Sequence, residues 1–157
     1  MSRSVLVLGL GNTLLCDEGA GVHVIRYLQE HHSDIPDVEY LDGGTLSFAL
    51  AGPIEDVDGL IVIDAAELGA EAGAIRCFQN QAMDTFVGSN RKRSVHEVSL
   101  LDLLAVAYLS DRLPARRALI GIQPHTVDWS DRPTEKIAEA IPQAGRQVLD
   151  ILQEWRQ

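Results

Sequence analysis

The sequence has few basic residues and no long hydrophobic run. Its 13 lysines and arginines stand against 23 aspartates and glutamates, which gives a net charge of −10. Because nucleic acids and anionic membranes attract cationic surfaces, this balance argues against both as general partners. No apolar run approaches the roughly 20 residues that a membrane-spanning helix requires. We therefore expect neither a nucleic-acid partner nor a membrane partner.

Cysteine is also scarce. Cys16 and Cys77 are the two cysteines, and they form neither a CxxC pair nor a zinc-finger spacing. The first 30 residues lack the cationic start, apolar core and small-residue cleavage site of a signal peptide. We therefore expect a cytoplasmic, reducing location with both thiols free. Cys16 precedes two acidic residues, so it is either a soft metal ligand or a small buried packing residue.

Two glycine motifs typical of nucleotide-binding proteins are missing. Gly9 and Gly11 fit the dinucleotide fingerprint, but Leu14 stands where its third glycine should be. A phosphate loop ending in Gly-Lys-Ser/Thr is absent, and so is the HExxH motif of zinc proteases. The acidic pair Asp17 and Glu18 would also repel a phosphate at the start of the next helix. The sequence therefore disfavours nucleotide binding.

What the chain does contain is an alternation of buried strands and amphipathic helices. Five short apolar runs predict strands at Val5–Leu8, Val38–Leu41, Leu60–Ile63, Ala74–Phe78 and Ala118–Ile122. Helical spacing is clearest at Glu18–Glu30, Val98–Leu109 and Thr134–Trp155, with a kink or break expected at Pro142. This alternation predicts a single α/β domain over residues 1–157, with a mostly parallel, twisted five-stranded sheet and helices on both faces.

Acidic residues follow three of these predicted strands. Asp17 and Glu18 come after the first strand and its glycine turn, Asp42 lies in LDGGT after the second, and Asp64 follows the third. Ligands of open α/β sheets bind at the carboxyl ends of the strands. Asp64 and Asp42 each also have a simpler interpretation as a turn or cap residue. For Asp42 this would be an Asx-type turn, with Thr45 capping the next helix.

His96 supplies a candidate nitrogen ligand. Ser94 and Glu97 predict a capping box, which would place His96 in the first turn of a helix near the sheet edge. Taken alone, His96 would be a surface or packing histidine. Together, Glu18, Asp64 and His96 form a ligand set suited to zinc, nickel, iron or manganese, with positions left open for substrate or water.

Two other polar segments leave alternatives open. Gln123, within the motif IGIQP, could hydrogen-bond a peptide backbone, whereas His125 is interpreted as an exposed loop residue. The basic cluster Arg91-Lys92-Arg93 is either a solvated loop or a docking contact for an acidic partner.

These blocks jointly resemble the maturation endopeptidases of [NiFe] hydrogenases. The matching blocks, in the family's order, are GLGNTLLCDEGAGV, LDGGT, IVIDAAE, SVHEVSLLDLLAVA and LIGIQP. The resemblance implies that Glu18, Asp64 and His96 are metal ligands and that Asp42 occupies an acidic position proposed to be important for catalysis.

The resemblance further implies an endopeptidase that removes a short C-terminal extension from the hydrogenase large-subunit precursor after nickel insertion. The substrate is expected to supply the nickel, so the resting enzyme would be metal-free. Whether the enzyme is of aspartic type or metal-assisted stays open. The working mechanism is attack by water, with Asp42 as candidate base and nickel as locator or Lewis acid.

Other functions remain open from the sequence. A non-catalytic chaperone that checks nickel in the large subunit would need the same three ligands. The GLGN turn suggests a peptidyl-tRNA hydrolase-like enzyme, although the acidity argues against a tRNA substrate. A general dipeptidase or aminopeptidase is less favoured, because two-metal sites need more ligands than the sequence offers.

Overall fold

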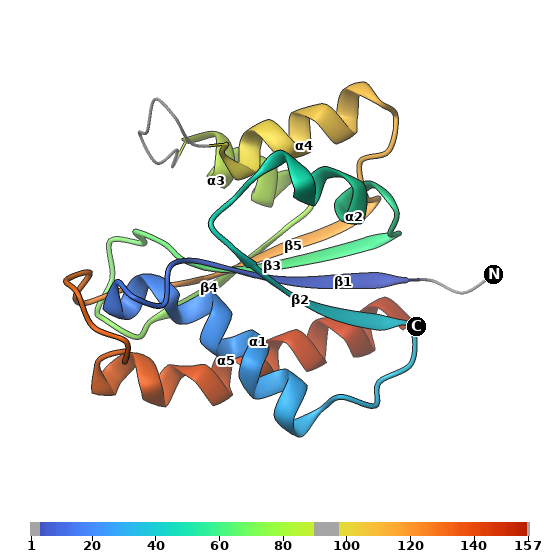
Figure 1. Ribbon diagram of the computed structural model, residues 1–157. Helices are drawn as coiled ribbons and strands as arrows, with labels where there is room; N and C mark the ends of the chain where they lie inside the picture. The colour runs from blue at the N-terminus through green and yellow to red at the C-terminus, as the bar shows by residue number, and fades with distance from the viewer. Residues whose placement is uncertain (1–3, 90–97, 157) are drawn as a thin grey trace.

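A five-stranded sheet forms the centre of the computed structural model, which describes residues 4–89 and 98–156 (Figure 1). The strands follow the order β2-β1-β3-β5-β4, and β4 alone among them runs antiparallel to its neighbour. Their bounds are β1 Val5–Leu10, β2 Val38–Gly44, β3 Gly59–Ala65, β4 Ile75–Gln79 and β5 Arg116–Ile122. The predicted fold class and the five predicted strands are confirmed.

Helices cover both faces of this sheet. In Figure 1, α1 (Ala20–His31) and α5 (Glu135–Arg156) lie below it, while α2 (Ala51–Glu55), α3 (Gln81–Ser89) and α4 (Leu100–Leu109) lie above it. Successive side chains of a strand point to opposite faces of the sheet. Val7 therefore joins the core between the sheet and helices α1 and α5, while Leu6 and Leu8 join the core on the opposite face. Within the described ranges, no helix combines the length and apolar character needed to cross a bilayer.

The long helix α5 continues through Pro142 as one element. Of the two alternatives predicted there, the break into two helices is wrong and the kink stays a prediction. Pro142 lacks the N–H that would bond to the carbonyl of Ala138. Both residues are exposed, so water can solvate that carbonyl. The opposite face of the helix stays buried from Ile137 to Trp155. We infer that this continuous burial outweighs the loss of one backbone hydrogen bond.

The start of α4 differs from the prediction. Ser99 is its N-cap and accepts a hydrogen bond from the Asp102 N–H at 3.1 Å, while the Ser99 N–H donates to Asp102 Oδ2 at 2.9 Å. This reciprocal pair is a capping box. The prediction that Ser94 caps this helix is therefore wrong. Ser94, His96 and Glu97 lie outside the described residues, as does the Arg91-Lys92-Arg93 cluster.

Candidate functional site

Two glycines bring the turn after β1 against the carboxyl edge of the sheet. Gly11 has a φ of +130°, and a Cβ on it would lie 1.9 Å from the Glu18 carbonyl oxygen. A Cβ on Gly21 would lie 2.1 Å from the Ile63 carbonyl oxygen. Only glycine permits such contacts. The short 3₁₀ turn Cys16–Gly19 thus carries Glu18 to the edge where Asp64 follows Ile63.

Glu18 and Asp64 line one cavity of about 600 Å³ at this carboxyl edge. Both side chains are half-buried. The volume lies within the range of small-ligand pockets. Among the described lining residues, the charged ones are the carboxylates Glu18, Asp64 and Glu67. The remaining walls come from residues 44–46, from α3 and the start of α4, and from Pro124 and Val127. The charge of the lining favours a cationic occupant.

His96 itself lies outside the described residues, but its neighbours in sequence reach the cavity. Val98 and Ser99, the first described residues after it, both contribute to the lining. Among the residues that the structure describes, no three His, Cys, Asp or Glu side chains form a group that could hold a metal ion. Of the three predicted ligands, Glu18 and Asp64 therefore line the same cavity, while His96 cannot be placed.

Asp42 is close in sequence to the cavity lining, but it is not part of that lining. The pairing of β1 with β2 shifts register after Gly9 and Asp42, and the Asp42 Oδ1 accepts a hydrogen bond from the Gly44 N–H at 2.9 Å. The Asx-type turn is therefore present. Thr45 does not cap the next helix, whose N-cap is Ser47. The Asp42 side chain is exposed, and the lining begins two residues further on, at Gly44.

Asp17, the neighbour of Glu18, has a different role. It is fully buried, and its Oδ2 accepts hydrogen bonds from the backbone N–H groups of His125 and Thr126, both at 2.9 Å. Its Oδ1 accepts the Thr134 N–H at 2.7 Å. Burial by itself would raise the pKa of Asp17, but the hydrogen bonds from Thr134, Thr126 and His125 outweigh it and lower this pKa. Asp17 therefore fastens the loop after β5 to the turn that carries Glu18.

Gln123 is also used within the chain. It is buried, its Oε1 accepts the Leu68 N–H at 2.7 Å, and its Nε2 donates to Glu67 Oε2 at 3.1 Å. The peptide backbone that Gln123 binds therefore belongs to this chain, in the loop at residues 68–70. A second, longer hydrogen bond comes from the Ala70 N–H. The prediction that His125 is an exposed loop residue is confirmed.

Both cysteines are free thiols, as predicted. Cys16 is buried, and its Sγ lies 3.7 Å from Asp17 Oδ1 as a weak donor. Burial raises the pKa of the Cys16 thiol, and the neighbouring Asp17 charge raises it further. Cys16 is also absent from the lining of the cavity that contains Glu18 and Asp64. The packing interpretation of Cys16 is therefore the one that the structure supports.

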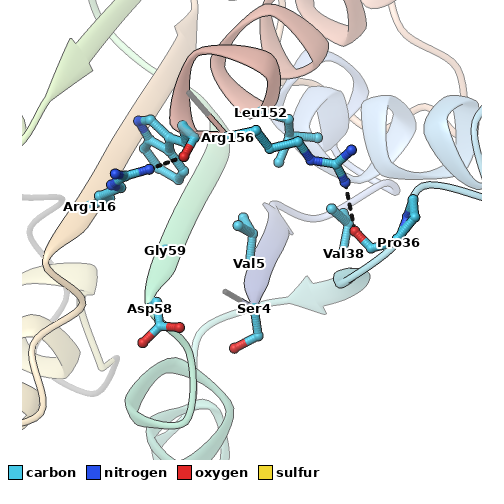
Figure 2. A pocket seen from close by; sticks show the side chains of 10 residues that line it. Ser4, Val5, Pro36, Val38, Asp58, Gly59, Arg116, Leu152 and Arg156 are labelled. Atoms are coloured by element: carbon cyan, nitrogen blue, oxygen red, sulfur yellow. Dashed lines mark hydrogen bonds between the residues drawn. The ribbon is translucent and has the colours of Figure 1, made fainter. Parts of the chain in front are cut away.

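A second cavity, of about 480 Å³, lies at the opposite, amino edge of the sheet (Figure 2). Its two arginines donate to carbonyl oxygens of the chain, Arg116 Nη1 to Trp155 and Arg156 Nη2 to Pro36, the latter at 2.7 Å. Both bonds hold the end of α5 against neighbouring segments. This amino-edge cavity is thus lined by cations already used in the fold.

Comparison with known proteins adds independent information. The sequence profile described as "Hydrogenase maturation protease" matches residues 22–151. The hydrogenase expression/formation protein HupD of Bradyrhizobium diazoefficiens is 33% identical over 152 residues, which cover 96% of this chain and 79% of HupD. The hydrogenase 2 maturation protease of Escherichia coli is 32% identical over 152 residues, covering 96% of this chain and 91% of that protein.

Solved structures show the same fold. The hydrogenase maturating endopeptidase HybD from E. coli superposes with a TM-score of 0.88 at 30% identity, covering 96% of this chain and 93% of HybD. The [NiFe] hydrogenase maturation protease HybD from Thermococcus kodakarensis gives a TM-score of 0.78 at 26% identity, covering 94% of this chain and 98% of that one.

Proposed function

This chain belongs to the hydrogenase maturation protease family, as its sequence blocks predict, and from that premise we propose its specific reaction. It is an endopeptidase that removes the C-terminal extension of a nickel-loaded [NiFe] hydrogenase large-subunit precursor. The observation that carries the proposal is that Glu18, in the turn after β1, and Asp64, at the end of the neighbouring strand β3, line the same cavity. We expect the reaction in the cytoplasm, since two free cysteines suit a reducing compartment.

The three proposed ligands suit an ion that arrives with the substrate. Glu18 and Asp64 offer carboxylate oxygens and His96 an imidazole nitrogen, a set compatible with nickel. His96 lies outside the described residues, so its place in this ligand set rests on the sequence. In this proposal the precursor brings the nickel, and the three side chains complete its coordination. The resting enzyme then needs no metal of its own.

Asp42 is the proposed general base. Its carboxylate is exposed and accepts a hydrogen bond from the N–H of Gly44, a residue that lines the cavity. Asp42 takes a proton from the water as the oxygen attacks the peptide carbonyl, and the proton then passes to the departing amino group. The nickel held by the substrate would locate the bond or polarise its carbonyl.

Mass spectrometry tests the proposal directly. The purified protein is incubated with nickel-loaded precursor, and the large subunit is expected to lose the mass of its C-terminal extension. Precursor without nickel serves as the control and is expected to keep its mass. A stable complex with nickel-loaded precursor whose mass stays unchanged would identify a non-catalytic chaperone and contradict the proposal.

Asp42→Asn separates catalysis from recognition. A side-chain amide cannot accept the proton of the attacking water, so cleavage should slow by about 10²- to 10⁴-fold. Precursor binding, measured by surface plasmon resonance, should stay within twofold of the wild-type value. Asp150→Asn, an exposed carboxylate on α5, is the matched control. Equal losses of cleavage and binding in Asp42→Asn would contradict its assignment as base.

A further inference from the structure

Exposed hydrophobic side chains gather beside the carboxyl-edge cavity. Among the described residues, the large exposed ones are Leu14, Phe48, Tyr108, Leu109, Val127 and Trp129. Three of these, Leu14, Val127 and Trp129, belong to the loops that follow β1 and β5. Val127 also lines the cavity that contains Glu18 and Asp64. We call Leu14, Val127 and Trp129 the apolar rim.

The two loops that carry the apolar rim are bonded to each other. The Ser130 N–H donates to the Leu14 carbonyl and the Cys16 N–H donates to the Ser130 carbonyl, both at 3.0 Å. On the other side of Trp129, the buried Asp17 accepts the Thr126 N–H. Trp129, 79% exposed, is therefore carried by a backbone fixed on both sides. Because the backbone around Trp129 is already ordered, a partner that covers the side chain does not also have to order a flexible loop, and less conformational entropy is lost on binding.

We propose that the apolar rim docks apolar side chains of the precursor polypeptide on its way to the bond that is cut. This inference rests on the proposed function and adds the surface that binds the substrate. Val127 belongs to both the apolar rim and the cavity lining, so the rim continues directly into the proposed substrate site. A second copy of this chain is a poorer occupant, because it would bring another net charge of −10 against the first.

Binding of nickel-loaded precursor to Trp129→Ala, measured by surface plasmon resonance, tests the docking surface. The Kd should rise at least about tenfold, as for a tryptophan at the centre of an interface. In the cleavage assay KM should rise while kcat stays within twofold. Tyr108→Ala is the matched control, since Tyr108 is 69% exposed at the end of α4 remote from the cavity, and its Kd should match the wild type.

Further variants guard against loss of the fold. Trp129→Phe keeps an aromatic ring and should bind precursor within about threefold of wild type, and Val127→Ala should weaken binding less than Trp129→Ala. A Trp129→Ala protein that binds precursor as tightly as wild type would overturn the proposal. So would a wild-type dimer in light scattering that dissociates on this substitution, because the rim would then bind a second copy.

The two proposals fail in distinguishable ways. If the wild-type protein binds precursor through Trp129 but the mass of the precursor never changes, the endopeptidase assignment fails and the docking surface stands. If wild type cleaves the precursor and Trp129→Ala leaves both Kd and KM unchanged, the docking surface fails and the endopeptidase assignment stands.

Discussion

The two edges of the sheet both hold cavities bordered by charged side chains, but the sign of those charges differs between the edges. At the amino edge, Arg116 and Arg156 donate to carbonyl groups of Trp155 and Pro36, and so hold the end of α5 in place. At the carboxyl edge, Glu18 and Asp64 line a cavity whose described charged residues are all acidic. The lining of the amino edge thus combines two structural arginines with Asp58, whereas the described charged residues at the carboxyl edge are all carboxylates.

Asp17 and Glu18 show the same contrast within two consecutive residues. Asp17 is buried and accepts hydrogen bonds from residues 108 to 117 positions away in the sequence. Glu18 is half-buried and lines the cavity. The first carboxylate holds the loop after β5 in place, and the second faces the space where a substrate would bind.

Substitutions of the three proposed metal ligands should have the largest effect, because they remove the function assigned to the carboxyl edge. Glu18→Gln, Asp64→Asn and His96→Ala should each slow precursor processing by at least about 100-fold, since even residues that only support metal ligands cost 10- to 100-fold when changed. The free energy of unfolding should change by less than about 1 kcal/mol for Glu18→Gln and Asp64→Asn, since both residues are partly exposed, and His96→Ala is expected to leave the fold largely intact. Mass spectrometry and urea denaturation measure the two effects.

Arg116→Gln at the amino edge is the matched control for these variants. It should process precursor within twofold of wild type while losing stability, because the Trp155 carbonyl loses its charged donor. If Arg116→Gln abolished processing as fully as Asp64→Asn, the division between a structural and a reactive edge would be wrong.

Asp17→Asn should have the next largest effect, this time on stability. The new amide group would direct N–H donors at the donors of Thr126 or Thr134, so buried hydrogen bonds are lost. We expect the free energy of unfolding to fall by about 2 to 4 kcal/mol in urea denaturation. Asp150→Asn should change it by less than about 0.5 kcal/mol. An Asp17→Asn protein as stable as wild type would show that the loop is held by other contacts.

The smallest expected effect concerns His23 on α1, the helix that leads away from the carboxyl edge. Burial lowers the pKa of His23 and the charge of Arg26 lowers it further, while its Nε2 is buried without a hydrogen-bond partner. The unfolded chain therefore binds a proton more readily than the folded one. The stability that neutral His23 contributes to the folded state is therefore fully present above the unfolded pKa of about 6.5, and it is lost as the pH falls below that value.

Urea denaturation at pH 7.5 and pH 5.5 tests this. Wild type should lose more stability between the two pH values than His23→Gln, which has no titrating side chain at that position. Identical losses in the two proteins would show that His23 does not sense pH in the folded state.

Much of the fold could be predicted because its local signals agree with its tertiary structure. The strands β1, β3 and β5 are apolar because both of their faces are covered, and the sequence shows this directly. The helices α2 and α3 were missed because five and nine residues are too short for a clear helical period. The break considered at Pro142 did not occur, because the sequence shows the local cost of proline but does not show the continuous burial of α5.

The site was predictable in part. Position after a strand indicates which acids reach the carboxyl edge, and Glu18 and Asp64 do line one cavity there. The same rule cannot separate Asp17 from Glu18, since the partners of Asp17 lie in a loop more than 100 residues away. Nor could the rule show that Asp42 would lie outside the cavity lining, next to a register shift between β1 and β2.

A crystal structure with bound nickel or cadmium tests the central claim most directly, with anomalous scattering used to locate the ion. The account predicts one ion within about 2.5 Å of a Glu18 oxygen, an Asp64 oxygen and a His96 nitrogen. An ion held elsewhere, or His96 directed away from an ion bound by the two carboxylates, would contradict it.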